Sequence, residues 1–136
     1  MIIRAILATS LALAASACVT PEAADTECAG EACVATGETF ETGGAAITPL
    51  EVLEDSRCPS NAECIWEGRI RIRALVERDG RDVEVELEQA ATTHALSGSL
   101  TLTQVWPQAP TAAGAISPAA YRFQFSWTPI LLDAQL

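Results

Sequence analysis

The chain has 136 residues, room for one domain, and its eight basic residues against eighteen acidic ones give a net charge of −10. All eight basic residues are arginines. So negative a charge excludes nucleic acid and anionic lipid head groups as electrostatic partners. Acidity of this kind favours solubility, and it would also favour a basic protein partner over an acidic one.

The first 17 residues have the layout of a secretory signal peptide. Arg4 supplies an early positive charge, residues 5–15 are apolar, and small residues precede Cys18. The apolar run is too short for a stable transmembrane anchor. Ala15-Ser16-Ala17 fits cleavage by an ordinary signal peptidase. Residues 15–18 also resemble the bacterial lipobox, whose cysteine is lipidated, although that pattern usually has leucine in place of the first alanine.

The cysteine count helps to choose between these two outcomes. Five cysteines are an odd number, which leaves one thiol unpaired in an exported protein. If Cys18 carries a lipid, four remain in two close pairs, Cys28 with Cys33 and Cys58 with Cys64. We therefore predict a lipoprotein held to the membrane of the bacterial cell envelope. The alternative is a soluble secreted or periplasmic protein with one free thiol.

Residues 18–38 are predicted to be a lipidated, flexible and acidic tether, because they are rich in Thr, Ala, Glu and Gly and lack hydrophobic periodicity. A Cys28–Cys33 bridge would close only a small local loop within it. Two cysteines without a nearby histidine are half of a zinc site, so no metal or other cofactor is predicted. The folded domain is expected to occupy residues 39–136.

The first part of this domain contains the clearest strand pattern of the chain. After a turn at Gly43-Gly44, residues 47–54 read as a strand that Pro49 confines to an edge or a strand start. Residues 70–77 and 82–88 alternate apolar and charged side chains on either side of Asp79-Gly80. Asp-Gly between two such runs predicts a hairpin with a two-residue type I′ turn.

The hairpin register follows from the turn. A two-residue turn places Val76 opposite Val83 on the apolar face and Arg71 opposite Glu88 on the charged face. Arg73 would likewise face Glu86. A slip by one residue would set valines against glutamates, so the register is well specified. We interpret the charged rows as a solvated surface rather than as a functional stripe.

The second half contains fewer clear elements. Residues 90–95 are expected to be a loop. Leu100, Leu102 and Trp106 indicate a strand, and residues 121–127 indicate another, with four alternating aromatic side chains that we assign to the core. About six short strands without helical periodicity predict an all-β fold, a small antiparallel β-sandwich or barrel. The pattern does not choose between these two architectures.

Residues 55–68, here called the stapled loop, are the most tightly specified stretch. Cys58 and Cys64 would close a small loop that stabilises the fold by about 2–2.5 kcal/mol in the chain-entropy model. Their spacing is longer than that of a redox Cys-x-x-Cys pair, which favours a structural bridge. Asp55 is expected to form an Asx turn, Trp66 to cover the disulfide or the end of the core, and Gly68 to allow a close approach.

The same stretch resembles a known group of sequences. It reads Asp-Ser-Arg-Cys-Pro, four residues, then Cys-x-Trp-x-Gly, between an apolar strand and an alternating one. This is similar to a group of uncharacterised small exported bacterial proteins, many of them lipoproteins, and the looser strand pattern extends the similarity over residues 39–127. The resemblance implies a location and an architecture, and it supplies no activity and no catalytic residues.

No catalytic motif was found in the sequence. The one histidine, His94, lies in the expected loop without a nucleophile motif, and the acidic residues lack EF-hand spacing. We therefore predict a non-enzymatic binding module, anchored by lipid and without nucleic-acid partners. Two alternatives are an inhibitor of a basic secreted hydrolase, such as a lysozyme or protease, and a carboxylate-based envelope enzyme. The predicted binding rim consists of Asp55, Arg57, Glu63, Trp66 and Glu67.

Overall fold

The protein is described by a computed structural model that places residues 28, 33–110 and 115–131. The predicted signal peptide and the lipidation site at Cys18 lie outside these residues. Within the described part of the chain, no helix is both long enough and apolar enough to cross a membrane.

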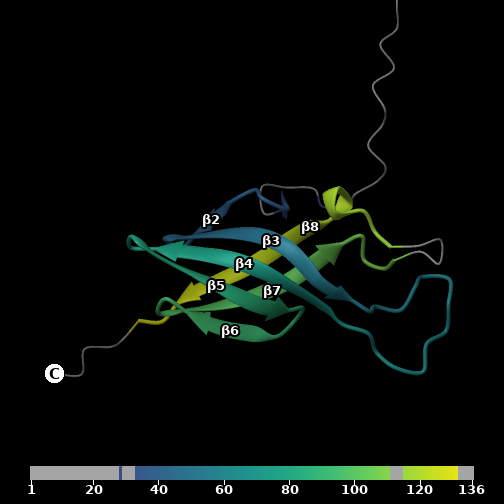
Figure 1. The fold of residues 1–136 in the computed structure, drawn as a ribbon. Coiled ribbons are helices and arrows are strands. Elements are labelled where there is room, and N and C mark those ends of the chain that lie inside the picture. The colour runs from purple at the N-terminus through teal and green to yellow at the C-terminus, as the bar shows by residue number, and fades with distance from the viewer. Residues whose placement is uncertain (1–27, 29–32, 111–114, 132–136) are drawn as a thin grey trace, which may run out of the picture.

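Eight strands form two four-stranded sheets that pack face to face as a β-sandwich (Figure 1). Sheet A has the order β1-β8-β7-β6 and sheet B the order β2-β3-β4-β5, and all paired strands are antiparallel. The elements are β1 Cys33–Ala35, β2 Phe40–Thr42, β3 Ala45–Asp55, β4 Ile70–Arg78, β5 Arg81–Glu88, β6 Thr92–Ala95, β7 Gly98–Trp106, a 3-10 turn η1 Pro118–Ala120, and β8 Arg122–Pro129. The all-β prediction is confirmed, and the architecture is the sandwich rather than the barrel.

The central hairpin has the predicted register. Val76 pairs with Val83, Arg71 with Glu88 and Arg73 with Glu86 across a turn at Asp79-Gly80. Asp79 and Gly80 both have positive φ, as a type I′ turn requires. The alternation of apolar and charged residues fixed this register because only one pairing keeps the charged rows out of the core.

Tyr121 and the three aromatic residues of β8 that follow it lie in the core, as predicted. Phe123 is fully buried, and Tyr121, Phe125 and Trp127 are each at most 7% exposed. Phe40 of sheet B stacks against Phe125 of sheet A with ring centroids 6.4 Å apart. This contact spans the two layers, so the aromatic side chains of β8 pack against sheet B instead of forming an exposed platform.

The folded domain begins earlier than the sequence indicated. Residues 33–35, assigned to the tether, form β1, which pairs with β8, and Val34 is 7% exposed in the core. The Cys28–Cys33 disulfide is therefore attached to the edge of sheet A. A three-residue strand with one inward side chain has no periodicity to detect, so only its pairing with β8 identifies it.

One further assignment in sheet A was wrong, and one strand is more irregular than its alternation indicated. Residues 92–95, expected to be a loop, form β6, a polar edge strand paired with β7. The strand indicated by Leu100, Leu102 and Trp106 is present as β7, and a register shift between Leu102 and Gln104 reverses its alternation, so that Trp106 does not share the core side with the two leucines. Beyond the shift, Val105, which is 1% exposed, occupies the core.

Pro49 lies in a part of β3 that is unpaired on one side, as predicted for a proline in a strand. β2 pairs with β3 only as far as Ile47, so no ladder partner from β2 reaches Pro49. The carbonyl oxygen of Pro49 accepts a hydrogen bond from the backbone amide of Gly37 at 2.8 Å.

Candidate functional site: the stapled loop

The stapled loop extends beyond the sheets at one end of the sandwich, between β3 and β4 (Figure 1). The predicted Cys58–Cys64 disulfide is present, with Cα atoms 5.9 Å apart. At its base the Ser56 amide donates to the carbonyl oxygen of Arg69 at 2.8 Å, which continues the β3–β4 ladder into the loop. The loop thus starts from a rigid pair of strands and is closed again by a covalent bond.

Gly68 makes the close approach that the sequence suggested. A methyl group added to its Cα would lie 1.7 Å from the carbonyl oxygen of Ser56. No side chain fits at that distance from a backbone atom. Glycine therefore allows the two ends of the loop to meet.

Asp55 and Arg57 form an ion pair that joins the stapled loop to sheet A. Arg57 Nε and Nη2 each donate to one Asp55 carboxylate oxygen at 2.8 Å, and both side chains are only 10% exposed. The Tyr121 hydroxyl donates to Asp55 Oδ2 at 2.8 Å, and Arg57 Nη1 donates to the carbonyl oxygen of Pro107 at 2.8 Å. Both charges are thus satisfied where solvent is scarce.

This arrangement corrects part of the predicted rim. Asp55 and Arg57 were expected on an exposed binding surface, but they face each other and the β7–β8 connection instead. The Asx turn is confirmed, because the Arg57 amide donates to Asp55 Oδ1 at 3.4 Å. The contact with Tyr121, 66 residues away, could not be read from local sequence.

The contacts of this cluster shift the protonation of Asp55 and Tyr121. Burial by itself would raise the pKa of Asp55, but the hydrogen bonds from Arg57 and Tyr121 outweigh that effect and leave the pKa lowered. Burial, together with the hydrogen bond to the Asp55 carboxylate, raises the pKa of Tyr121 to about 12. The carboxylate is thus held ionised and the phenol neutral, and the two Asp55 oxygens are already occupied by partners.

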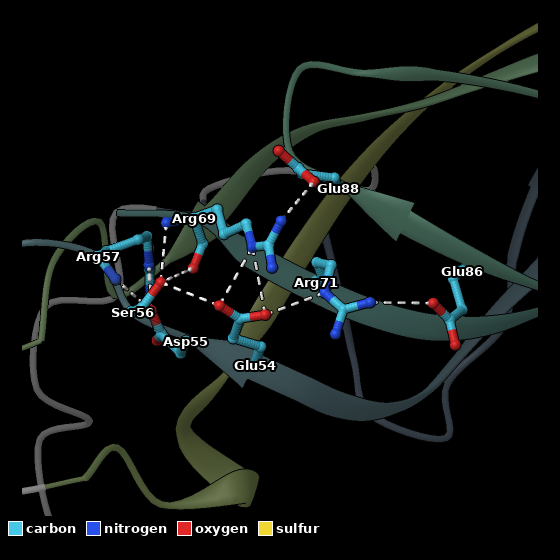
Figure 2. A network of polar contacts seen from close by, with 8 residues as sticks. All are labelled: Glu54, Asp55, Ser56, Arg57, Arg69, Arg71, Glu86 and Glu88. Atoms are coloured by element: carbon cyan, nitrogen blue, oxygen red, sulfur yellow. Dashed lines mark hydrogen bonds and ion pairs between the residues drawn. The ribbon is translucent and has the colours of Figure 1, made fainter. Parts of the chain in front are cut away.

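A second polar network lies on the outer surface of sheet B, beside the loop (Figure 2). Glu54 accepts hydrogen bonds from Arg69 Nε and from Arg71 Nε, both at 3.1 Å, and these two bonds lower its pKa. Arg71 Nη1 also binds Glu86 at 3.1 Å, and Arg69 Nη1 lies 4.0 Å from Glu88. The backbone register is as predicted, yet Arg71 reaches the diagonal glutamate rather than the one directly opposite.

The two residues that follow Cys64 in the loop, Ile65 and Trp66, here called the Ile65–Trp66 tip, present large apolar side chains to solvent. Ile65 is 94% exposed and Trp66 is 65% exposed. The expectation that Trp66 covers the disulfide or the core is therefore wrong. Glu63 and Glu67, which flank the tip, are exposed as the predicted rim requires. The sequence signal for the tip was two adjacent apolar residues directly after the second cysteine of a polar, disulfide-closed loop and before an acid.

Other candidate features lie apart from the loop tip. A hollow of about 450 Å³ lies between β3 and Tyr121. A second hollow, of about 640 Å³, lies where the turns 42–45 and 78–81 approach each other. His94 lies on β6, where its Nδ1 is 3.1 Å from the hydroxyl oxygen of Ser99. In the described part of the chain, no three His, Cys, Asp or Glu side chains are grouped so that they could hold a metal ion.

Comparison with known proteins adds no relative. No protein-family model, curated protein or solved structure matches this chain. Its two disulfides indicate an extracytoplasmic, oxidising compartment, because such bonds are rare in reducing cytosol.

Proposed function

We propose that the protein is a lipid-anchored, non-enzymatic binding module of the bacterial envelope, and that it captures a basic protein partner with the Ile65–Trp66 tip. The observation that carries this proposal is the exposure of the two tip residues, 94% for Ile65 and 65% for Trp66, directly after a disulfide-closed loop. Large exposed apolar groups mark interaction sites, and tryptophan is enriched among the residues that dominate binding energy.

The attachment of the loop supports this function. The disulfide closes it, Arg57 ties it to Pro107, and the Ser60 amide donates to the carbonyl oxygen of Pro110 at 3.1 Å. A loop held in one shape loses little conformational entropy on binding, so the tip is preorganised for a pocket on its partner.

The charge of the chain indicates the chemistry of the partner. Glu63 and Glu67 flank the tip, and the whole chain carries −10. A complementary basic surface would be steered to the loop, with an association rate that falls as salt rises. A basic secreted hydrolase would meet this requirement, which makes inhibition of such an enzyme the second candidate.

Anchoring belongs to the same proposal and has its own test. The lipobox-like residues 15–18 would place a lipid on Cys18, and the resemblance to small exported bacterial lipoproteins agrees with this. A Cys18→Ala variant should lose lipid labelling and leave the membrane fraction. Continued membrane fractionation of that variant would contradict the anchor.

The tip is tested by capture from envelope extract with the full chain carrying Ile65→Ser and Trp66→Ser. A suitable control is Leu131→Ser, because Leu131 is 81% exposed and lies outside the loop. We expect a basic partner to bind the wild type and the control, to be lost from the tip variant, and to dissociate faster at high salt. Equal capture by the tip variant would refute the proposal.

Assays of lysozyme and protease activity with excess protein test the inhibitor alternative.

A further inference from the structure

The charged residues of the strands are divided very unequally between the two sheets. The strands of sheet B contain thirteen: one in β2, three in β3, four in β4 and five in β5. The strands of sheet A contain one, Arg122. In a chain of net charge −10, an outer sheet surface almost free of charge is a distinct feature, because charged residues are the usual occupants of solvent-facing strand positions.

Hydroxyl groups occupy much of that surface. Along β7 and β8, Leu100 and Trp127 point into the core, so the neighbouring Ser99, Thr101, Ser126 and Thr128 point outward. On the edge strand β6, Thr92 and His94 continue the outward rows. We call the six outward residues the hydroxyl face: Thr92, His94, Ser99, Thr101, Ser126 and Thr128.

The strand register arranges these side chains in two rows of three. Thr92, Thr101 and Ser126 are paired across the sheet, as are His94, Ser99 and Thr128. Neighbouring strands are about 4.8 Å apart, and successive outward residues about 6.8 Å apart along a strand. Thr92 and Thr101 share a hydrogen bond of 3.1 Å, and so do His94 and Ser99. A hydroxyl can donate one hydrogen bond and accept two, so even the paired hydroxyls keep capacity for a ligand, and the face offers a regular set of neutral donors and acceptors.

The last residue of β7, Trp106, places an aromatic side chain on the same outer surface. Beyond its register shift, Val105 is buried and Trp106 points outward, opposite Arg122 in the pairing. Trp106 is half-buried, and its indole Nε1, which is itself buried, has no hydrogen-bond partner among the described residues. This aromatic ring, five residues beyond Thr101 along β7, adds an apolar surface against which a flat, hydroxyl-rich ligand can pack.

From this geometry we infer that the hydroxyl face binds an uncharged, hydroxyl-rich polymer, a neutral polysaccharide. Charge complementarity selects this occupant: a charged ligand would need opposite charges that the face lacks, whereas a polyol exchanges neutral hydrogen bonds with it. A second copy of the chain is disfavoured, because stable protein interfaces need an apolar centre. The strand β7, about 27 Å long over nine residues, offers an extended surface that suits a polymer.

The test measures retention of the mature full chain on insoluble chitin, cellulose and amylose. The variant is Ser126→Asp with Thr128→Asp, since both residues are exposed. Its matched control, Thr39→Asp with Ala119→Asp, adds the same charge at exposed positions outside the face. We expect wild type and control to bind at least one polysaccharide, and the face variant to bind it at least tenfold more weakly with an unchanged unfolding temperature.

Two outcomes would overturn the inference. The first is absence of retention on all three polysaccharides, or equal retention of the face variant. The second is a wild-type dimer that the face variant dissociates, without polysaccharide binding, which would assign the face to self-association. The Ile65→Ser, Trp66→Ser variant should retain polysaccharide binding, so failure of the tip proposal and failure of this one can be distinguished.

Discussion

Replacing Tyr121 with phenylalanine tests whether the buried Asp55 cluster holds the two sheets together at the loop end. The change removes one hydroxyl and keeps the ring, so the core packing of this 5% exposed side chain is preserved. It deletes the 2.8 Å hydrogen bond to the Asp55 carboxylate. A bond to a charged group contributes roughly 1.5–3 kcal/mol. We therefore expect the free energy of unfolding to fall by about 2 kcal/mol, equivalent to about 8–16 °C in melting temperature for a domain of this size.

The assay is urea unfolding followed by tryptophan fluorescence, with Thr103→Val as the control. The Thr103 hydroxyl donates to the carbonyl oxygen of Gln124 at 3.0 Å, so the control removes a bond between neutral groups. Its loss should be smaller, about 1 kcal/mol. A Tyr121→Phe loss no larger than that of the control would refute the assignment of a charge-assisted bond.

The pH dependence gives a second readout that a packing defect would not change. The pKa of Tyr121 is raised from 10.0 to about 12 in the folded protein. Between pH 10 and 12 the unfolded chain loses this proton while the folded protein keeps it, so wild-type stability falls over that range. Tyr121→Phe should lack this alkaline loss.

At the acid end, the pKa of Asp55 is lowered in the folded protein, so the stability that the ionised carboxylate contributes is lost as pH falls through that folded pKa. The variant lacks the hydrogen bond from Tyr121 that helps to lower this pKa, so it should lose the same contribution to stability at a higher pH. Identical pH profiles would refute the coupling.

Three further changes test the loop and the charged sheet. Gly68→Ala places a methyl group 1.7 Å from a backbone oxygen and should cost more than about 2 kcal/mol of unfolding free energy in urea titration; a neutral result would refute the close approach. Replacing both Cys58 and Cys64 by serine should cost about 2–2.5 kcal/mol and raise protease cleavage within the loop, whereas unchanged cleavage would show that the staple is not needed. Glu86→Gln breaks an exposed pair with Arg71 and should cost less than about 1 kcal/mol, a loss that 1 M salt removes.

The sequence by itself determined the central hairpin and the aromatic core. Asp79-Gly80 fixed the turn, and the apolar alternation allowed only one pairing of β4 with β5. The same period of two placed the β8 aromatics on one side of their strand, where they are buried. The Cys58–Cys64 staple and the close approach at Gly68 were also legible, because both depend on residues near each other in the chain.

The tertiary structure decided what local periodicity cannot encode. Tyr121 and Asp55 meet only because the end of β3 and the start of β8 lie at the same end of the sandwich, and this contact turned a predicted rim carboxylate into a largely buried anchor. A register shift in β7 set Trp106 on the other side of the strand from Leu100 and Leu102, and pairing with β7 turned an expected loop into β6. Trp66 points to solvent because no strand or loop of the described chain covers the tip. Short strands, bulges and loop contacts are fixed by hydrogen bonds between distant segments, so they emerge only when both sheets are in place.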